Sequence, residues 1–68
     1  QSIQKLTGRE IEVLQLLARG FTNKEISEKL FLSVKTIEAH RSKIYQKLNI
    51  KTRAELVDYA IRHKLMEL

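Results

Sequence analysis

The sequence predicts an all-α fold, a bundle of four helices that contains a helix-turn-helix. Proline is absent and glycine occurs only twice, a composition that favours uninterrupted helices. The Thr-x-x-Glu pattern of a capping box, which marks the start of a helix, occurs three times. Apolar residues then recur at intervals of three and four, the period of a helix with one buried face. Together these observations set the number of helices and their order.

The size and composition indicate a single small domain that helix packing alone must stabilise. The chain has 68 residues and no cysteine, and a domain of this size buries only about 60% of its unfolded surface. With two histidines and no thiolate ligand, neither a structural metal nor another cofactor is expected. No apolar run approaches the roughly 20 residues of a membrane span, and the first residues show no signal-peptide pattern. We therefore expect a cytoplasmic protein without a membrane partner.

The domain is expected to span residues 7–68, preceded by a linker remnant at residues 1–6. The first helix is predicted at 8–19, where Thr7 and Glu10 form a capping box and Gly20 can adopt the left-handed conformation that ends a helix. Val13 and Leu16 widen its apolar face. That face comprises Ile11, Leu14, Leu17 and Ala18.

The second and third helices are predicted at 23–30 and 34–48. Thr22 and Glu25 form the capping box of the former, and Ser33 and Asn49 are the expected caps of the latter. The small side chain of Ser27 indicates a close neighbour in mid-helix. The apolar residues of the third helix are Val34, Ile37, Ile44 and Leu48, and Leu30, Leu32, Val34 and Ile37 are expected to cluster across the turn. That cluster would hold the two helices at the steep angle of a helix-turn-helix.

The fourth helix is predicted at 53–63, after the capping box of Thr52 and Glu55. Its core residues are expected to be Leu56, Ala60 and Ile61. His63 and Lys64 complement the negative end of the helix dipole. The last four residues are expected either to fold back on the core or to fray.

The outward face of the predicted third helix is basic. On a helical wheel with Ile37 inward, Lys35, Ala39 and Ser42 point outward and Glu38 lies at their flank. Between residues 34 and 48 four residues are lysine or arginine and one is acidic, in a chain of net charge +5. A basic helix face favours a nucleic-acid partner. The four side chains also suit base edges. Lysine can donate to guanine, and glutamate can accept from the amino group of cytosine. Serine can donate or accept, and the alanine methyl can contact the methyl group of thymine.

Other polar residues are candidates for phosphate contacts, which position a protein on DNA without reading sequence. They are Thr22, Asn23, Lys24, Thr36, Lys43 and Lys47. The alternative for each lysine is an ordinary solvated surface, and Thr22 has a capping role in any case. His40 lies at the edge of the apolar stripe, which favours packing or hydrogen bonding over a catalytic or metal-binding role.

Several short motifs resemble one known family. They are Leu6-Thr7-x-Arg9-Glu10, Val13-Leu14-x-Leu16, Gly20, Asn23-Lys24-Glu25-Ile26, Leu32-Ser33, Thr36-Ile37-x-x-His40 and Lys47-Leu48. The chain resembles the LuxR/FixJ-type (NarL-like) helix-turn-helix domain of bacterial transcription and response regulators. The resemblance implies a C-terminal four-helix domain whose third helix enters the major groove of double-stranded DNA. It implies Lys35, Glu38, Ala39 and Ser42 as the base-facing residues.

The same resemblance implies partners beyond DNA. They are a second copy of the chain, which forms a homodimer through the fourth helix, an upstream receiver or sensor domain, and RNA polymerase. The implied dimer contacts are Val57, Asp58, Tyr59 and Arg62, with core packing as the alternative for Val57. Many members of the family carry lysine where this chain has Glu38, so their base preference does not carry over.

The sequence therefore predicts sequence-specific DNA binding for transcription regulation, by a dimeric response regulator in a bacterial cytoplasm, associated with the nucleoid when bound. A sigma-factor-like promoter-recognition domain is the alternative within nucleic-acid binding. A helical protein-interaction adaptor is the alternative from another class. An enzyme is not expected, because no nucleophile–base pair, carboxylate pair or metal-ligand set stands out.

Overall fold

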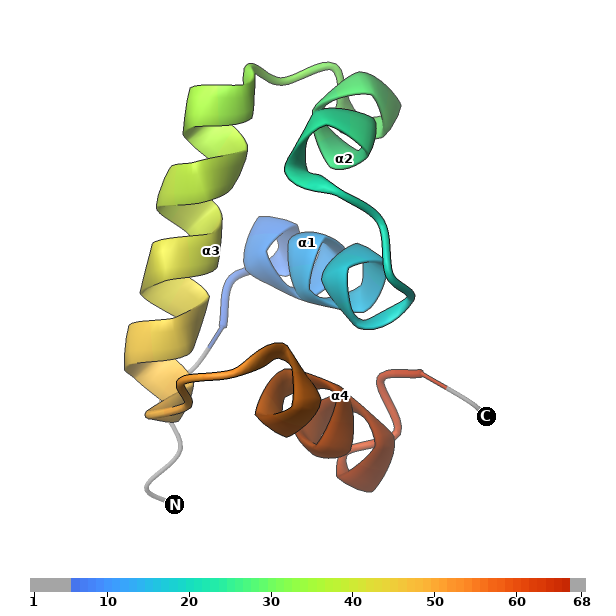
Figure 1. Ribbon diagram of the computed structural model, residues 1–68, viewed down its shortest axis with the longest axis vertical. Helices are drawn as coiled ribbons and strands as arrows, with labels where there is room; N and C mark the ends of the chain where they lie inside the picture. The colour runs from blue at the N-terminus through green and yellow to red at the C-terminus, as the bar shows by residue number, and fades with distance from the viewer. Residues whose placement is uncertain (1–5, 67–68) are drawn as a thin grey trace.

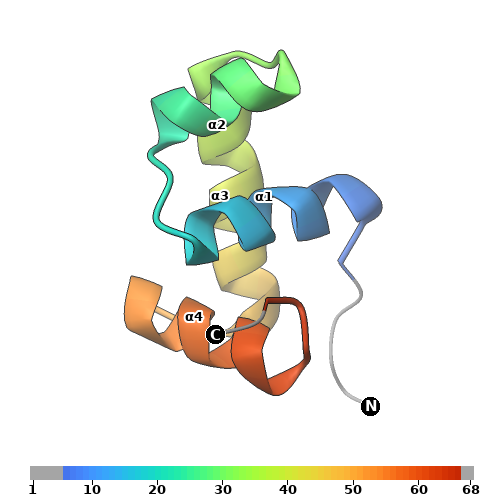
Figure 2. The ribbon, with the colours of Figure 1, turned by 90° about the vertical axis from the view of Figure 1, so that its right-hand side faces the viewer.

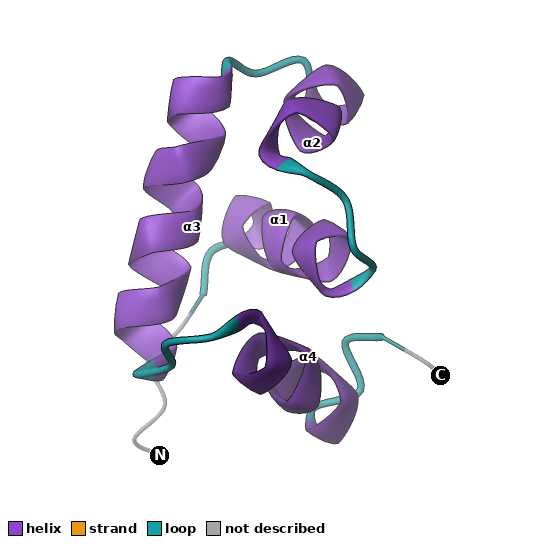
Figure 3. Ribbon diagram, in the orientation of Figure 1, coloured by secondary structure: helices purple, strands orange, loops and turns teal. Residues whose placement is uncertain are grey.

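A computed structural model describes residues 6–66 as four helices joined by short loops (Figure 1, Figure 3). They are α1 (Gly8–Ala18), α2 (Asn23–Leu30), α3 (Val34–Leu48) and α4 (Arg53–Arg62). The predicted all-α class is confirmed, and every helix boundary agrees within one residue. Most of the expected linker, residues 1–5, lies outside the described residues, as do residues 67–68 of the tail. Leu6 packs against the core, and so do Leu65 and Met66.

Each helix begins at the cap that the sequence predicts. In all three Thr-x-x-Glu boxes the threonine hydroxyl accepts from the glutamate N–H, and the glutamate carboxylate accepts from the threonine N–H. At α3 the Ser33 hydroxyl accepts from the N–H of Thr36 at 3.1 Å. These bonds satisfy N–H groups that have no partner within the helix. The starts of all four helices are thus determined locally.

The four helices also end in one common way. A residue with positive φ follows each helix: Gly20 (98°), Phe31 (58°), Asn49 (55°) and Lys64 (59°). The next residue in each case donates its N–H to a carbonyl five residues earlier. Those next residues are Phe21, Leu32, Ile50 and Leu65, and all four are partly buried against the core. This is the Schellman arrangement, so each turn inserts one apolar side chain as it stops the helix.

Phe31 is a poor residue for its position, and replacing it should stabilise the domain. Its side chain is 93% exposed and its backbone is left-handed, which costs a residue with a Cβ about 1–2 kcal/mol. Because asparagine tolerates this conformation, we expect Phe31→Asn to raise the free energy of unfolding by about 1 kcal/mol. Urea denaturation measures the change. Asn49→Ala, at the matching position after α3, should shift the midpoint in the opposite direction.

The core lies between α1 and the other three helices. Its buried apolar residues are Val13, Leu14, Leu17, Ala18, Ile26, Ile37, Ile44, Leu56 and Ala60. Helix α1 crosses the middle of the domain, with α2 on one side and α4 on the other, and α3 runs past all three (Figure 2). Two side-chain hydrogen bonds join α1 to α4 and to the residues that follow it. Arg53 donates to the Leu17 carbonyl at 2.8 Å and Gln15 to that of Leu65 at 3.0 Å.

Three core predictions need correction. Val34 was expected inside the cluster across the turn, but it is 39% exposed, because as the first residue of α3 it has no preceding helical turn to cover it. Ile11 is only half-buried, whereas Val13 is fully buried, so the buried face of α1 is rotated from the expected one. On α4, Val57 packs against the core and Ile61 remains partly exposed. The prediction for Ser27 is confirmed, since it is buried.

Candidate nucleic-acid interface

Helix α3 leaves one long side free of the rest of the domain. Figure 1 shows α1, α2 and α4 all on one side of α3, and the turned view of Figure 2 agrees. Ile37 and Ile44 face the core. The predicted base-facing residues, Lys35, Glu38, Ala39 and Ser42, are all exposed. We call these four residues the outward strip. They share one stretch of α3, so the sequence pattern and the exposure agree on which face is available.

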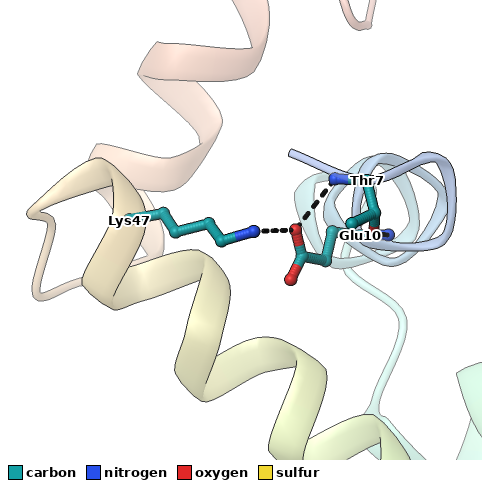
Figure 4. A network of polar contacts seen from close by, with 3 residues as sticks. All are labelled: Thr7, Glu10 and Lys47. Atoms are coloured by element: carbon teal, nitrogen blue, oxygen red, sulfur yellow. Dashed lines mark hydrogen bonds and ion pairs between the residues drawn. The ribbon is translucent and has the colours of Figure 1, made fainter. Parts of the chain in front are cut away.

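A buried ion pair fixes the far half of α3 against the start of α1 (Figure 4). The Lys47 ammonium lies 2.8 Å from Oε1 of Glu10, whose side chain is only 4% exposed, while that of Lys47 is 28% exposed. The same Oε1 accepts from the N–H of Thr7 at 2.9 Å. The hydrogen bond from Lys47 is the main cause of a lowered pKa at Glu10, which burial opposes. Glu10 is therefore ionised at neutral pH.

The ion pair gives Lys47 a structural contact that sequence reasoning missed. Glu10 was recognised only as part of a capping box, and Lys47 only as a candidate for a phosphate contact. The two residues are 37 positions apart, and no local pattern connects them. Whether Lys47 also touches DNA stays a prediction, but one of its roles is to hold α3 in place.

The other phosphate candidates form two groups. Thr22, Asn23 and Lys24 lie at the start of α2, where Thr22 is the N-cap and Lys24 is exposed. Thr36 and Lys43 lie on α3 itself. The Thr36 hydroxyl is 2.9 Å from that of Ser33. In Figure 2 the start of α2 and the start of α1 lie on opposite sides of α3, so polar groups are available on both flanks of the outward strip.

A hollow of about 530 Å³ opens between the start of α1 and the first half of α3. We call it the α1–α3 hollow. It is lined by Thr7, Glu10, Ser33, Lys35, Thr36, Ala39, His40 and Lys43. His40 is half-buried here and lines the hollow together with Glu10. The hollow joins candidates for base and phosphate contacts to the cap of α1, a connection that sequence analysis did not predict.

The candidate dimer residues on α4 differ in their surroundings. Asp58 and Arg62 are exposed and paired at 2.8 Å. Tyr59 stacks on His63 with ring centroids 4.1 Å apart, and both Val57 and Tyr59 are half-buried against the core. Core packing, the alternative considered for Val57, is thus present. Val57 and Tyr59 both remain partly accessible on the helix that carries the charged pair.

The described part of the chain contains no group of three or more His, Cys, Asp or Glu side chains placed to hold a metal ion. Within residues 6–66, no helix has both the length and the apolar character needed to cross a membrane.

Comparison with known proteins decides the family. The profile of a family described as "Bacterial regulatory proteins, luxR family" matches residues 4–60. The chain belongs to the LuxR family. This confirms the resemblance seen in the motifs, and it makes the chain a DNA-binding helix-turn-helix domain of a LuxR-family transcription regulator.

Relatives and a solved structure support the same conclusion. Oxygen regulatory protein NreC of Staphylococcus carnosus is 58% identical over 62 residues, which cover 91% of this chain and 29% of NreC. NreC of Staphylococcus aureus is 56% identical over 62 residues, with the same coverage. The crystal structure of ChrA, a response regulator of a haem-sensing two-component system, has a TM-score of 0.82 and 38% identity, covering 93% of this chain and 31% of ChrA. This LuxR-family chain thus spans less than a third of the proteins it resembles.

Proposed function

We propose that this domain is the DNA-binding effector of a two-component response regulator and that it acts as a dimer. The observation that carries the proposal is the free side of α3, whose outward strip is exposed while every other helix packs behind it. A helix can enter the roughly 12 Å major groove only if one side is unobstructed. The similarity to NreC and ChrA supports the response-regulator setting, in a bacterial cytoplasm.

In this mechanism binding involves no chemistry. Lysines of the interface neutralise phosphates and release counterions, which supplies salt-dependent affinity. The outward strip supplies discrimination, at about 1–3 kcal/mol for each good contact to a base. One domain reads few base pairs, so useful affinity requires two half-sites about one helical turn apart. A receiver domain would raise the effective concentration of the second copy, and bound dimers would act on RNA polymerase.

We place the dimer contact on the exposed side of α4. Asp58 and Arg62 would exchange partners across a two-fold axis, because a charge pair on one surface is self-complementary in such an interface. Val57 and Tyr59 would supply the apolar edge. This arrangement leaves α3 free, since α4 lies beside α1 and away from the outward strip.

Selection from random duplex DNA, followed by fluorescence-anisotropy titration at two salt concentrations, tests the function. We expect a consensus, and an affinity that falls steeply with salt. The protein-interaction adaptor predicts no duplex affinity even at low salt. The sigma-factor-like alternative predicts selection of promoter elements, and the LuxR-family match favours the first hypothesis over it.

Glu38→Ala should change base preference more than it changes overall affinity. Glu38 belongs to the outward strip and can accept from a cytosine amino group, so its loss should relax one position of the consensus by about tenfold. Repeating the selection with the variant measures this. Glu28→Ala is the matched control, because it removes the same charge from an exposed site on α2. An unchanged consensus for Glu38→Ala would rule out base reading by this residue.

A further inference from the structure

A second hollow, of about 260 Å³, opens between α1 and the end of α2. We call it the α1–α2 hollow. Leu16 and Leu30 form its apolar part, and both also pack against the core. Glu12, Gln15 and Arg19 complete its lining. Glu12 and Arg19 are exposed, so charges of opposite sign border an apolar floor.

The hollow lies on the side of the domain that faces away from the outward strip. Glu12, Leu16 and Arg19 are spaced by four and three residues, so they share one face of α1. Leu14 and Leu17, on the opposite face, are fully buried. In Figure 2 α1 crosses in front of α3, with α2 on one side of it and α4 on the other. The exposed face of α1 therefore points away from α3, and a partner seated on it leaves α3 accessible to DNA.

The charges on this face of α1 are complementary to themselves. Leu16 lies in the middle, with Glu12 and Arg19 each about one helical turn away on either side. A two-fold axis that passes beside Leu16, perpendicular to α1, makes two copies of α1 antiparallel. Glu12 of each copy then faces Arg19 of the other, as an interface between identical surfaces requires. Glu12 also pairs with Arg9 at 3.2 Å, but both side chains are about half exposed, so Glu12 can accept from a second cation.

Phe31 supplies an apolar anchor for such an interface. Its side chain is 93% exposed, and its left-handed backbone, with φ of 58°, costs free energy. It follows Leu30, which lines the hollow, so its backbone adjoins the edge of the hollow. Strained residues cluster where a function depends on them, and aromatic residues seated in a pocket are typical hot spots of protein interfaces. An exposed Phe31 beside an apolar hollow thus indicates a protein partner.

We propose that the α1–α2 hollow and Phe31 form a self-association surface, on which two copies of the chain pack back to back and Phe31 of each copy covers the hollow of the other. This surface is separate from the α4 contact. Because the two-fold axis lies in the plane of contact, the two outward strips point in opposite directions. The assembly would therefore hold two duplexes, or two distant sites of one duplex. The self-association stands without DNA, whereas this bridging of duplexes rests on the proposed function.

Charge reversal tests the surface by sedimentation velocity without DNA. Every chain in this experiment carries Asp58→Arg, which opposes the α4 contact. We expect it to associate as its concentration is raised. Adding Glu12→Arg or Arg19→Glu alone should raise the dissociation constant at least about tenfold, because like charges then face each other. Both reversals in one chain should restore association, and so should an equimolar mixture of the two single variants.

Phe31→Asn separates association from stability. It should weaken association at least about tenfold, as expected for a hot spot, although it stabilises the fold. A more stable chain that associates less has lost a contact and not its structure. Val34→Asn is the matched control, because Val34 is also an exposed apolar residue but begins α3. If Phe31→Asn associated as tightly as Val34→Asn, or if both reversals together failed to restore association, the inference would be overturned.

Capture of a free labelled duplex by an immobilised one tests the bridging. The chain without Asp58→Arg should capture the second duplex. Glu12→Arg and Arg19→Glu should each lose the capture yet keep most of their affinity for a single duplex, because their charges lie on the side away from α3. A chain that stays monomeric with Asp58→Arg and still binds one duplex would overturn this inference alone. A chain that associates but selects no duplex would support the surface and overturn the proposed function.

Discussion

Glu10→Ala should lower the free energy of unfolding by about 3 kcal/mol. Removing one partner of a buried ion pair typically costs about 3–5 kcal/mol, and the partial exposure of Lys47 places this pair at the lower end. The change also removes half of the capping box with Thr7. A domain of this size has only about 5 kcal/mol of stability, so the variant should be close to unfolding at 37 °C. Urea denaturation at neutral pH measures the loss.

Glu12→Ala is the matched control on the same helix. Glu12 pairs with Arg9 at 3.2 Å, but both side chains are about half exposed, and exposed pairs contribute about 0–1 kcal/mol. We therefore expect its unfolding midpoint to stay near that of the original chain. If the two variants lost the same free energy of unfolding, the Glu10–Lys47 pair would stabilise the domain no more than an exposed pair does.

The Glu10–Lys47 pair makes the free energy of unfolding depend on pH in the acidic range. The pKa of Glu10 is lowered from its ordinary value of 4.5, chiefly by the bond from Lys47. A lowered folded-state pKa gives stability that is complete above the ordinary pKa and is lost as the pH falls through the folded-state value. The difference in stability between the original chain and Glu10→Gln should therefore be constant at neutral pH and shrink below pH 4.5. If the difference in stability stayed the same well below pH 4.5, it would arise from the packing of the Glu10 side chain and not from its charge.

Ala39→Glu should reduce DNA affinity at least about 100-fold while leaving the fold intact. Ala39 is exposed on α3, within the strip proposed to face the groove. A glutamate there adds bulk where the helix approaches the bases and a charge that the phosphates repel, and juxtaposed like charges cost several kcal/mol. Because glutamate is a good helix former, stability should change little. Anisotropy titration on the selected duplex measures the affinity.

Ala54→Glu provides the control for this substitution. Ala54 is also an exposed alanine in a helix, but it lies in the first turn of α4, where a negative charge suits the dipole. It should bind DNA as the original chain does. If both variants bound equally well, the outward strip would not be the reading surface.

Much of the fold could be predicted because its signals are local. The bonds of each capping box join residues three apart, so the start of a helix is visible in four letters. Gly20 and Asn49 indicated helix ends for the same reason. Phe31 and Lys64 did not, since neither residue type favours positive φ. At those two positions the next residue, Leu32 or Leu65, packs against the core and so stabilises the turn.

The site was predicted in part. A helical wheel depends on one inward residue, and Ile37 supplied it correctly, so all four residues of the outward strip are exposed as expected. Val34 was misplaced because the wheel gives an angle but does not show that the first residue of a helix has no preceding turn to cover it. The α1–α3 hollow had no signal at all, because it exists only where α1 crosses α3.

The sequence by itself determined where the helices begin, which face of α3 is polar and which family the chain belongs to. These properties depend on residues within one turn of each other or on motifs of fixed spacing. Only the tertiary structure decided that Glu10 and Lys47 meet and that Thr7, Thr36 and Lys43 line one hollow. Those neighbours come from the angles at which helices pack, which depend on all the side chains of the core together.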